Sequence, residues 1–145
     1  MLSLGGAAGN LCRDLLRRSL RNGILVISLF ASRRAPLIVR PDPAVVGVGE
    51  EVAWQLSFDA EGPSFDDPLE WTIYFSNGHP FGSLRSGIWR QRTDAAKPGD
   101  RGSHRGILAA APAREPGDYK YGVRISNART GEQLSDDDPM LIVRR

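Results

Sequence analysis

Residues 116–127 read Pro-Gly-Asp-Tyr-Lys-Tyr-Gly-Val-Arg-Ile-Ser-Asn, and this stretch decides the fold. Pro116 and Gly117 predict a turn, after which four large side chains alternate with polar or small ones. Because side chains of a strand point to opposite faces at every second residue, the large ones form a single apolar stripe: Tyr119, Tyr121, Val123 and Ile125. Such a stripe must pack against a second sheet, so we expect a half-buried central strand here.

Similar alternation recurs from residue 37 onward, in short runs separated by Pro, Gly and Asp turns. This pattern is typical of sandwiches and barrels. The expected strands are 37–39, 45–48, 52–58, 69–75, 104–111, 119–126 and 140–143, with a long irregular loop over 77–102 and a tight turn at 127–131. We therefore predict an all-β fold, an antiparallel Greek-key β-sandwich of about seven to eight strands. Its predicted core contains Trp54, Trp71, Ile73, Tyr121, Val123 and Ile125.

Charge divides the 145 residues into two parts. Residues 1–40 carry seven arginines and one aspartate, a net charge of +6, whereas residues 41–145 carry 12 basic and 16 acidic groups, a net charge of −4. Specific nucleic-acid binding by the body is disfavoured, because it requires a basic face that neutralises phosphates. The single cysteine, Cys12, excludes an intrachain disulfide and a site built from several thiolates.

Residues 1–36 are expected to form a basic and apolar arm in front of a sandwich domain at 37–145. A helix is predicted over 11–22, and the apolar run 24–31 is far shorter than the roughly 20 residues that cross a bilayer as a helix. Three interpretations stay open: a signal or transit peptide, a mis-assigned start, and a retained arm that binds a protein partner, a second copy or an anionic membrane surface. An exported location is slightly favoured over a cytoplasmic one.

Two segments carry a family resemblance. Gly117-Asp118-Tyr119-Lys120-Tyr121, with the C-terminal Leu-Ile-Val strand, resembles the end of cupredoxin-like domains, and residues 48–54 resemble the Gly-acidic-x-Val-x-Trp entry to one of their strands. Immunoglobulin-like sandwiches share much of this pattern, including a tyrosine whose hydroxyl ties down a corner, a role that the resemblance assigns to Tyr119. Val123 stands where the copper proteins carry a cysteine, and Ser126 or Asn127 stands in place of the following histidine. The resemblance thus implies a copper-less relative with no cofactor.

The sequence gives only weak support for a metal site or a catalytic site. His79 and His104, with Asp94 or Asp100, could hold a metal or act in acid–base chemistry, but histidines in a polar loop are more often solvated. Calcium could bind the acidic residues near the C-terminus together with a second pair, although a solvated turn is the commoner explanation: Asp136, Asp137, Asp138, Asp66 and Asp67.

The best candidate binding surface is the basic loop, whose proposed contact residues are Arg85, Trp89, Arg90, Arg92 and Arg101. Trp89 either offers a stacking face or caps an open end of the core. We predict a non-enzymatic binding or assembly module, with no small-molecule substrate identified. An exported accessory domain without copper is the alternative, and an enzyme that uses the 78–105 loop is a more distant one.

Overall fold

The computed structural model describes residues 23–32, 36–59, 67–83, 85–93 and 103–145, without the side chains of residues 59, 103 and 104. Within these ranges the chain is all-β, with eleven strands and no helix. The helix predicted over residues 11–22 lies outside the described residues. In chain order the strands are β1 (Ile24–Ser32), β2 (Ile38–Arg40), β3 (Ala44–Gly47), β4 (Glu51–Asp59), β5 (Leu69–Tyr74), β6 (Ile88–Thr93), β7 (Ser103–Ala109), β8 (Gly117–Lys120), β9 (Gly122–Asn127), β10 (Gln133–Asp137) and β11 (Met140–Arg144).

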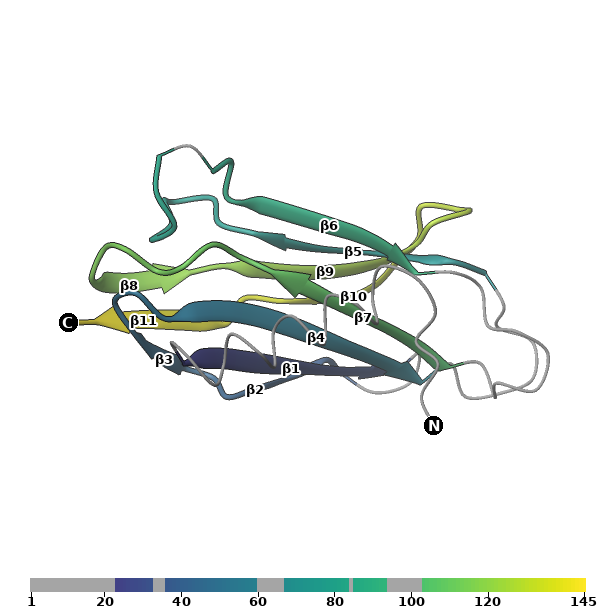
Figure 1. Ribbon diagram of the computed structural model, residues 1–145. Helices are drawn as coiled ribbons and strands as arrows, with labels where there is room; N and C mark the ends of the chain where they lie inside the picture. The colour runs from purple at the N-terminus through teal and green to yellow at the C-terminus, as the bar shows by residue number, and fades with distance from the viewer. Residues whose placement is uncertain (1–22, 33–35, 60–66, 84, 94–102) are drawn as a thin grey trace.

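Three mostly antiparallel sheets hold these strands. One four-stranded sheet has the order β2-β1-β4-β7, a second has the order β10-β9-β5-β6, and a three-stranded sheet has the order β3-β11-β8. The pairs β1–β4 and β3–β11 are parallel. In Figure 1 the two four-stranded sheets form facing layers, and the third sheet lies at the end where the chain terminates. The architecture is therefore sandwich-like, as the alternation predicted.

Strand β1 corrects the prediction of an arm in front of the domain. It pairs with β4 over its whole length, from Ile24 opposite Glu51 to Ser32 opposite Asp59, and it separates β4 from β2. Ile27 and Leu29 are fully buried. The apolar run 24–31, which the sequence analysis assigned to the arm, therefore lies in a strand within the sheet, so a boundary at residue 36 would separate this strand from its neighbours. Large apolar residues occupy both alternating sets of positions in this run, with Ser28 between them, so it has no clear period of two and its place inside the sandwich was not predicted.

Two other strands lie where loops or turns were expected. β6 occupies the middle of the predicted 77–102 loop and pairs with β5 from Leu69–Thr93 to Tyr74–Ile88. β10 follows the turn predicted at residues 127–131. That turn is confirmed by the hydrogen bond from the Gly131 N–H to the Asn127 carbonyl at 2.8 Å. The expected 119–126 strand is split at Tyr121 into β8 and β9, and β9 is central, as predicted, between β10 and β5.

The core between the layers contains the predicted residues. Each of the six is 2% exposed or less: Trp54, Trp71, Ile73, Tyr121, Val123 and Ile125. At one end four aromatic rings surround Trp54 with centroids 5.7–6.3 Å from its own, and they belong to Phe75, Phe81, Trp89 and Tyr121. Edge-on and tilted contacts of this kind add to the stabilisation that burial alone supplies.

A glutamine from β6 joins the two layers at one side. Gln91 accepts a hydrogen bond from the Ile107 N–H (3.1 Å) and donates one to the Ile107 carbonyl (3.0 Å), so its amide pairs with β7 as a neighbouring strand would. The same Oε1 atom accepts the indole N–H of Trp71 at 3.1 Å. A Cβ atom at Gly106 would lie 2.9 Å from Trp71 Nε1, so only glycine leaves room for these hydrogen bonds of Gln91.

Tyr119 fastens the corner that precedes the central strand. Its hydroxyl donates to the Glu115 carbonyl at 3.0 Å, which agrees with the corner-fixing role expected of this tyrosine. Burial, and to a smaller extent the Glu115 carboxylate, raise the pKa of this hydroxyl.

Candidate functional site

The basic loop of the prediction is divided by strand β6. Arg90 and Arg92 are exposed and alternate along β6 with Trp89 and Gln91, which point inward. Trp89 packs against the core with its ring 5.8 Å from that of Trp54 and 5.3 Å from that of Phe81. Of the two interpretations of Trp89, the structure thus supports the core cap and not the free stacking face.

Of the remaining two predicted contact residues, the structure describes only Arg85. Arg85 is exposed in the connection before β6, where its carbonyl accepts a hydrogen bond from a histidine. Arg101 lies outside the described residues, as do Asp94 and Asp100. Only Arg90 and Arg92 of the predicted set therefore share one face of one strand.

The outer face of the sheet β10-β9-β5-β6 brings a third arginine beside them, which the sequence analysis missed. Directly opposed residues of antiparallel strands project from the same face. One row across the sheet reads Arg90 (β6), Thr72 (β5), Arg124 (β9) and Asp136 (β10), because each is opposite the next. The adjoining row contains Arg92, Glu70, Ser126 and Gln133.

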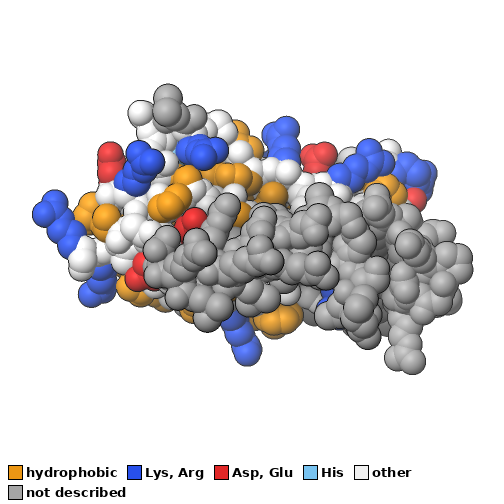
Figure 2. Space-filling view, in the orientation of Figure 1, with side chains coloured by type: hydrophobic (Ala, Val, Ile, Leu, Met, Phe, Trp, Pro, Cys, Tyr) orange, Lys and Arg blue, Asp and Glu red, His pale blue; other side chains and the backbone are white. Residues whose placement is uncertain are grey.

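Lys and Arg side chains gather along the upper margin of Figure 2, over the layer that holds β5 and β6, with acidic side chains between them. The face therefore combines an excess of positive charge with acceptor groups.

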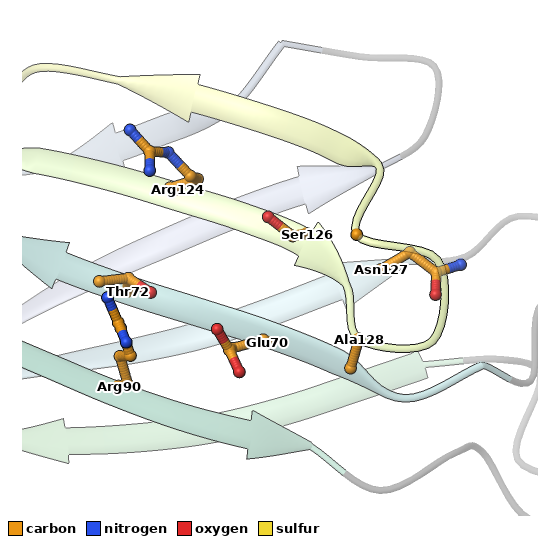
Figure 3. Close-up of a pocket in the computed structure, with 8 residues that line it drawn as sticks. Glu70, Thr72, Arg90, Arg124, Ser126, Asn127 and Ala128 are labelled. Carbon is orange, nitrogen blue, oxygen red and sulfur yellow. The ribbon is translucent and has the colours of Figure 1, made fainter.

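A shallow depression of ≈ 270 Å³ lies on this outer face. Strands β5, β6 and β9 line it, together with the turn that follows β9, and the lining residues are Glu70, Thr72, Arg90, Arg124, Ser126, Asn127, Ala128 and Gly131. Figure 3 shows Arg90 beside Thr72, and Glu70 between the strand of Arg90 and the strand of Ser126. Two guanidinium groups, a carboxylate and two hydroxyls thus line one polar hollow.

Arg124 is held by an aromatic ring at the edge of this hollow. Its guanidinium carbon lies 5.0 Å from the centre of the Tyr74 ring, and its Nη2 is 3.5 Å from the Tyr74 hydroxyl oxygen. A Cβ atom at Gly122 would collide with that ring, so the glycine opposite Tyr74 provides the room for it. A cation above an aromatic face gains about 0.5–1 kcal/mol at an exposed site. The Tyr74 ring therefore orients the Arg124 side chain.

His79 makes hydrogen bonds through both ring nitrogens. The Phe81 N–H donates to His79 Nδ1 at 3.1 Å, so Nε2 must carry the proton that it shares with the Arg85 carbonyl at 2.9 Å. Both ring nitrogens are thus used to hold the connection between β5 and β6. The backbone of His104 lies in β7 opposite Phe58, and its side chain is outside the described part. A metal shared by the two histidines would require His79 to give up one of these bonds.

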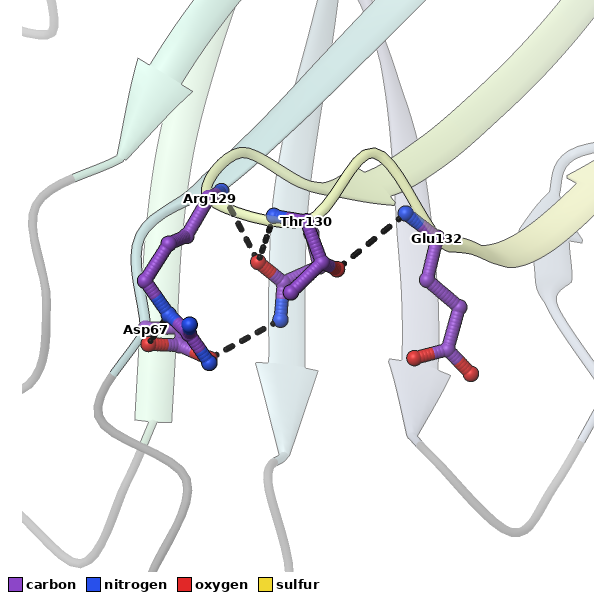
Figure 4. A network of polar contacts seen from close by, with 5 residues as sticks. Asp67, Arg129, Thr130 and Glu132 are labelled. Carbon is purple, nitrogen blue, oxygen red and sulfur yellow. Dashed lines mark hydrogen bonds and ion pairs between the residues drawn. The ribbon is translucent and has the colours of Figure 1, made fainter.

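The acidic residues considered for calcium are separated in the structure. Asp67 is bound by Arg129 through Nε at 2.8 Å and Nη2 at 3.0 Å, and by Asn127 Nδ2 at 3.0 Å. The Asn127 side-chain oxygen accepts the N–H groups of Arg129 and Thr130. Figure 4 shows Asp67, Arg129 and Thr130 in this network at the β9–β10 turn. The role of this network is structural.

Asp137 lies opposite Val123, four residues along β9 from the turn, which is about 13 Å in a strand. Asp138 pairs with Lys120 at 3.8 Å. Asp66 is outside the described residues. Across the part of the chain that the structure describes, no three His, Cys, Asp or Glu side chains come together as metal ligands would.

Two buried polar atoms have no hydrogen-bond partner among the described residues: Trp54 Nε1 and the Tyr121 hydroxyl oxygen. Burial raises the pKa of Tyr121 well above its usual range, and the neighbouring Trp54 side chain opposes this rise only in part. Tyr121 is therefore neutral in the folded protein at any ordinary pH, and it fills space in the core.

No protein-family model matches this chain, and no curated protein shows significant sequence similarity to it. In the described ranges no helix is both long and apolar enough to span a membrane.

Proposed function

We propose that this protein is a non-enzymatic binding module that contacts a protein partner through the outer face of the sheet β10-β9-β5-β6. The observation that carries the proposal is the row Arg90–Thr72–Arg124, in which two exposed arginines flank a hydroxyl beside a polar hollow. Arginine and tyrosine are enriched in the residues that dominate protein–protein binding energy. Carboxylates on the partner's surface are the groups that such a face fits best.

The composition of the face favours a protein over a nucleic acid. Glu70 lies between Arg92 and Ser126, and Asp136 lies beside Arg124, so acidic groups interrupt the positive charge. A phosphate backbone is bound by a continuous basic track, whereas mixed charges suit the mixed surface of a protein.

Binding, and not catalysis, fits the polar groups around this face. His79 is engaged through both nitrogens, and the Ser86 hydroxyl bonds to the backbone of Ile88. A hydrolytic site needs a base that is free to activate its nucleophile, and the hydrogen bonds already made by these two side chains support binding over such chemistry.

We further propose that the domain is a sandwich of the immunoglobulin-like or copper-less cupredoxin-like kind. The Tyr119 corner supports this assignment, and so does the split of the segment 38–47 into β2 and β3, which pair with different sheets. Because sandwiches of this kind host many activities, the assignment says nothing about the partner, which must be identified through the site.

The test measures binding of the full-length protein to a fluorescently labelled poly-glutamate peptide by anisotropy. The variant Arg90→Gln/Arg124→Gln removes two charges from the face, and Arg40→Gln/Arg144→Gln is a control that removes two exposed charges outside it. Two exposed charge contacts of about 0.2–1 kcal/mol each predict about a 2- to 30-fold loss of affinity for the first variant.

The control should bind as the wild type does. Binding should also weaken as the salt concentration rises from about 0.1 M to about 1 M, because the distance over which charges interact falls from about 10 Å to about 3 Å. Equal losses in both variants would contradict the proposal, and so would a lack of binding at protein concentrations at which the chain is monomeric.

A further inference from the structure

We propose that the partner is a second copy of this chain, and that the outer face of β10-β9-β5-β6 is the self-complementary interface of a two-fold homodimer. This inference rests on the proposed function, because it uses the same face. Its basis is the order of charges across the sheet: positive on β6 at Arg90, neutral on β5 at Thr72, positive on β9 at Arg124, and negative on β10 at Asp136.

A two-fold axis parallel to the strands, lying in the interface, reverses the order of strands in the second copy. β6 then faces β10 of the other copy, and β5 faces β9. Arg90 meets Asp136 of the second copy, and by the same symmetry Asp136 meets Arg90, so each dimer contains this ion pair twice. A face with one sign of charge on both edges would instead repel its own copy.

The inner strands are complementary in the same arrangement. Arg124 of the second copy lies over β5 at the level of Thr72, one row from Glu70. Face-packed sheets are about 10 Å apart, a gap that long arginine side chains from one copy can cross to reach the shorter carboxylates of the other. Exposed Ile88, with Tyr74 opposite it, supplies apolar contact at one end of the face.

The isolated chain leaves these charges ready for a partner. Arg124 is turned onto the Tyr74 ring and makes no ion pair with Asp136, although the two residues are directly opposed. Asp136 itself has no ion-pair partner among the described residues; Lys120–Asp138 and Arg129–Asp67 are the pairs formed elsewhere on the surface. The carboxylate at one edge of the face and the guanidinium at the other edge are thus both available to form ion pairs with a partner.

Sedimentation velocity and light scattering of the full-length protein over a range of concentrations test this proposal. The wild type is expected to pass from the monomer mass of 15.9 kDa to twice that mass as concentration rises. Arg90→Glu and Asp136→Lys each place like charges at both symmetric contacts, so each should weaken dimerisation at least about tenfold. The double variant restores the pair with its signs exchanged and should dimerise within about threefold of wild type.

An equimolar mixture of the two single variants provides an independent check. In the mixed dimer Glu at position 90 of one copy meets Lys at position 136 of the other, and the native Arg90–Asp136 pair forms at the second contact. The mixture should therefore associate where neither variant does alone. Thermal melting of each variant verifies that it is folded.

A monomeric wild type at every concentration overturns the homodimer. If that protein still binds poly-glutamate through Arg90 and Arg124, the binding face is retained and its partner is a foreign acidic protein; if it binds neither, both proposals fail. A dimer that is unaffected by either charge reversal uses another surface and also overturns this inference.

Discussion

Replacement of Gln91 by methionine should measure how much this side chain stabilises the contact between the two layers. Methionine has nearly the same length and volume, so the change removes hydrogen bonding with little change in packing. Three bonds are lost: two to the backbone of Ile107 and one from the indole of Trp71. At about 0.5–1.5 kcal/mol each, the free energy of unfolding should fall by about 1.5–4.5 kcal/mol. The higher end of the range applies if water cannot reach the groups left without partners.

Urea unfolding followed by tryptophan fluorescence measures this loss, which corresponds to a midpoint lowered by about 1–2 M. Gln55→Met is the matched control, because Gln55 is exposed on β4 and the same chemical change there should cost less than about 0.5 kcal/mol. If the two variants unfold at the same urea concentration, Gln91 does not join the sheets, and the account of how the layers are held together is wrong.

Two further changes test the core and its borders. Trp71→Ala removes a fully buried indole and should cost about 3–5 kcal/mol, so its melting temperature should fall far below that of wild type; an unchanged melting temperature would exclude Trp71 from the core. Tyr119→Phe should cost about 0.5–1.5 kcal/mol in urea unfolding because it removes the bond to Glu115, whereas Tyr121→Phe should be neutral or stabilising because its hydroxyl has no partner among the described residues. Burial raises the pKa of Tyr121 in the folded state above the unfolded value of about 10. The contribution of Tyr121 to stability is therefore constant below about pH 10 and declines above it. The variant Tyr121→Phe should thus lose less stability than the wild type as the pH rises above about 10.

The nature of the core could be derived from residue order alone. Alternation in the segments around Trp54, Trp71 and Tyr121 predicted which side chains are buried, because a strand offers only two faces and the apolar one must leave water. The turn at residues 127–131 and the Tyr119 corner are equally local, since each is formed by groups a few positions apart.

The tertiary structure decided what the local pattern does not encode. Strand β1 carries large apolar residues on both faces, so no clear period marks it, and only its place between β2 and β4 shows that it belongs to the sheet. β6 is a strand whose inward residue Gln91 is polar, because its amide is satisfied by the edge of β7. A hydrogen-bond partner 16 positions away cannot be read from the neighbours of a glutamine.

The candidate site shows the same division between local and long-range information. Sequence reasoning found Arg90 and Arg92 because they are close together in the chain, but it could not add Arg124 or Asp136 to them. Those residues join the face through strand pairing across β5 and β9, a register set by burial of the opposite face. The sequence alone therefore determined which residues lie inside in the alternating strands, because burial there follows local periodicity. Only the tertiary structure decided which charges share a surface, because that depends on which strands are neighbours.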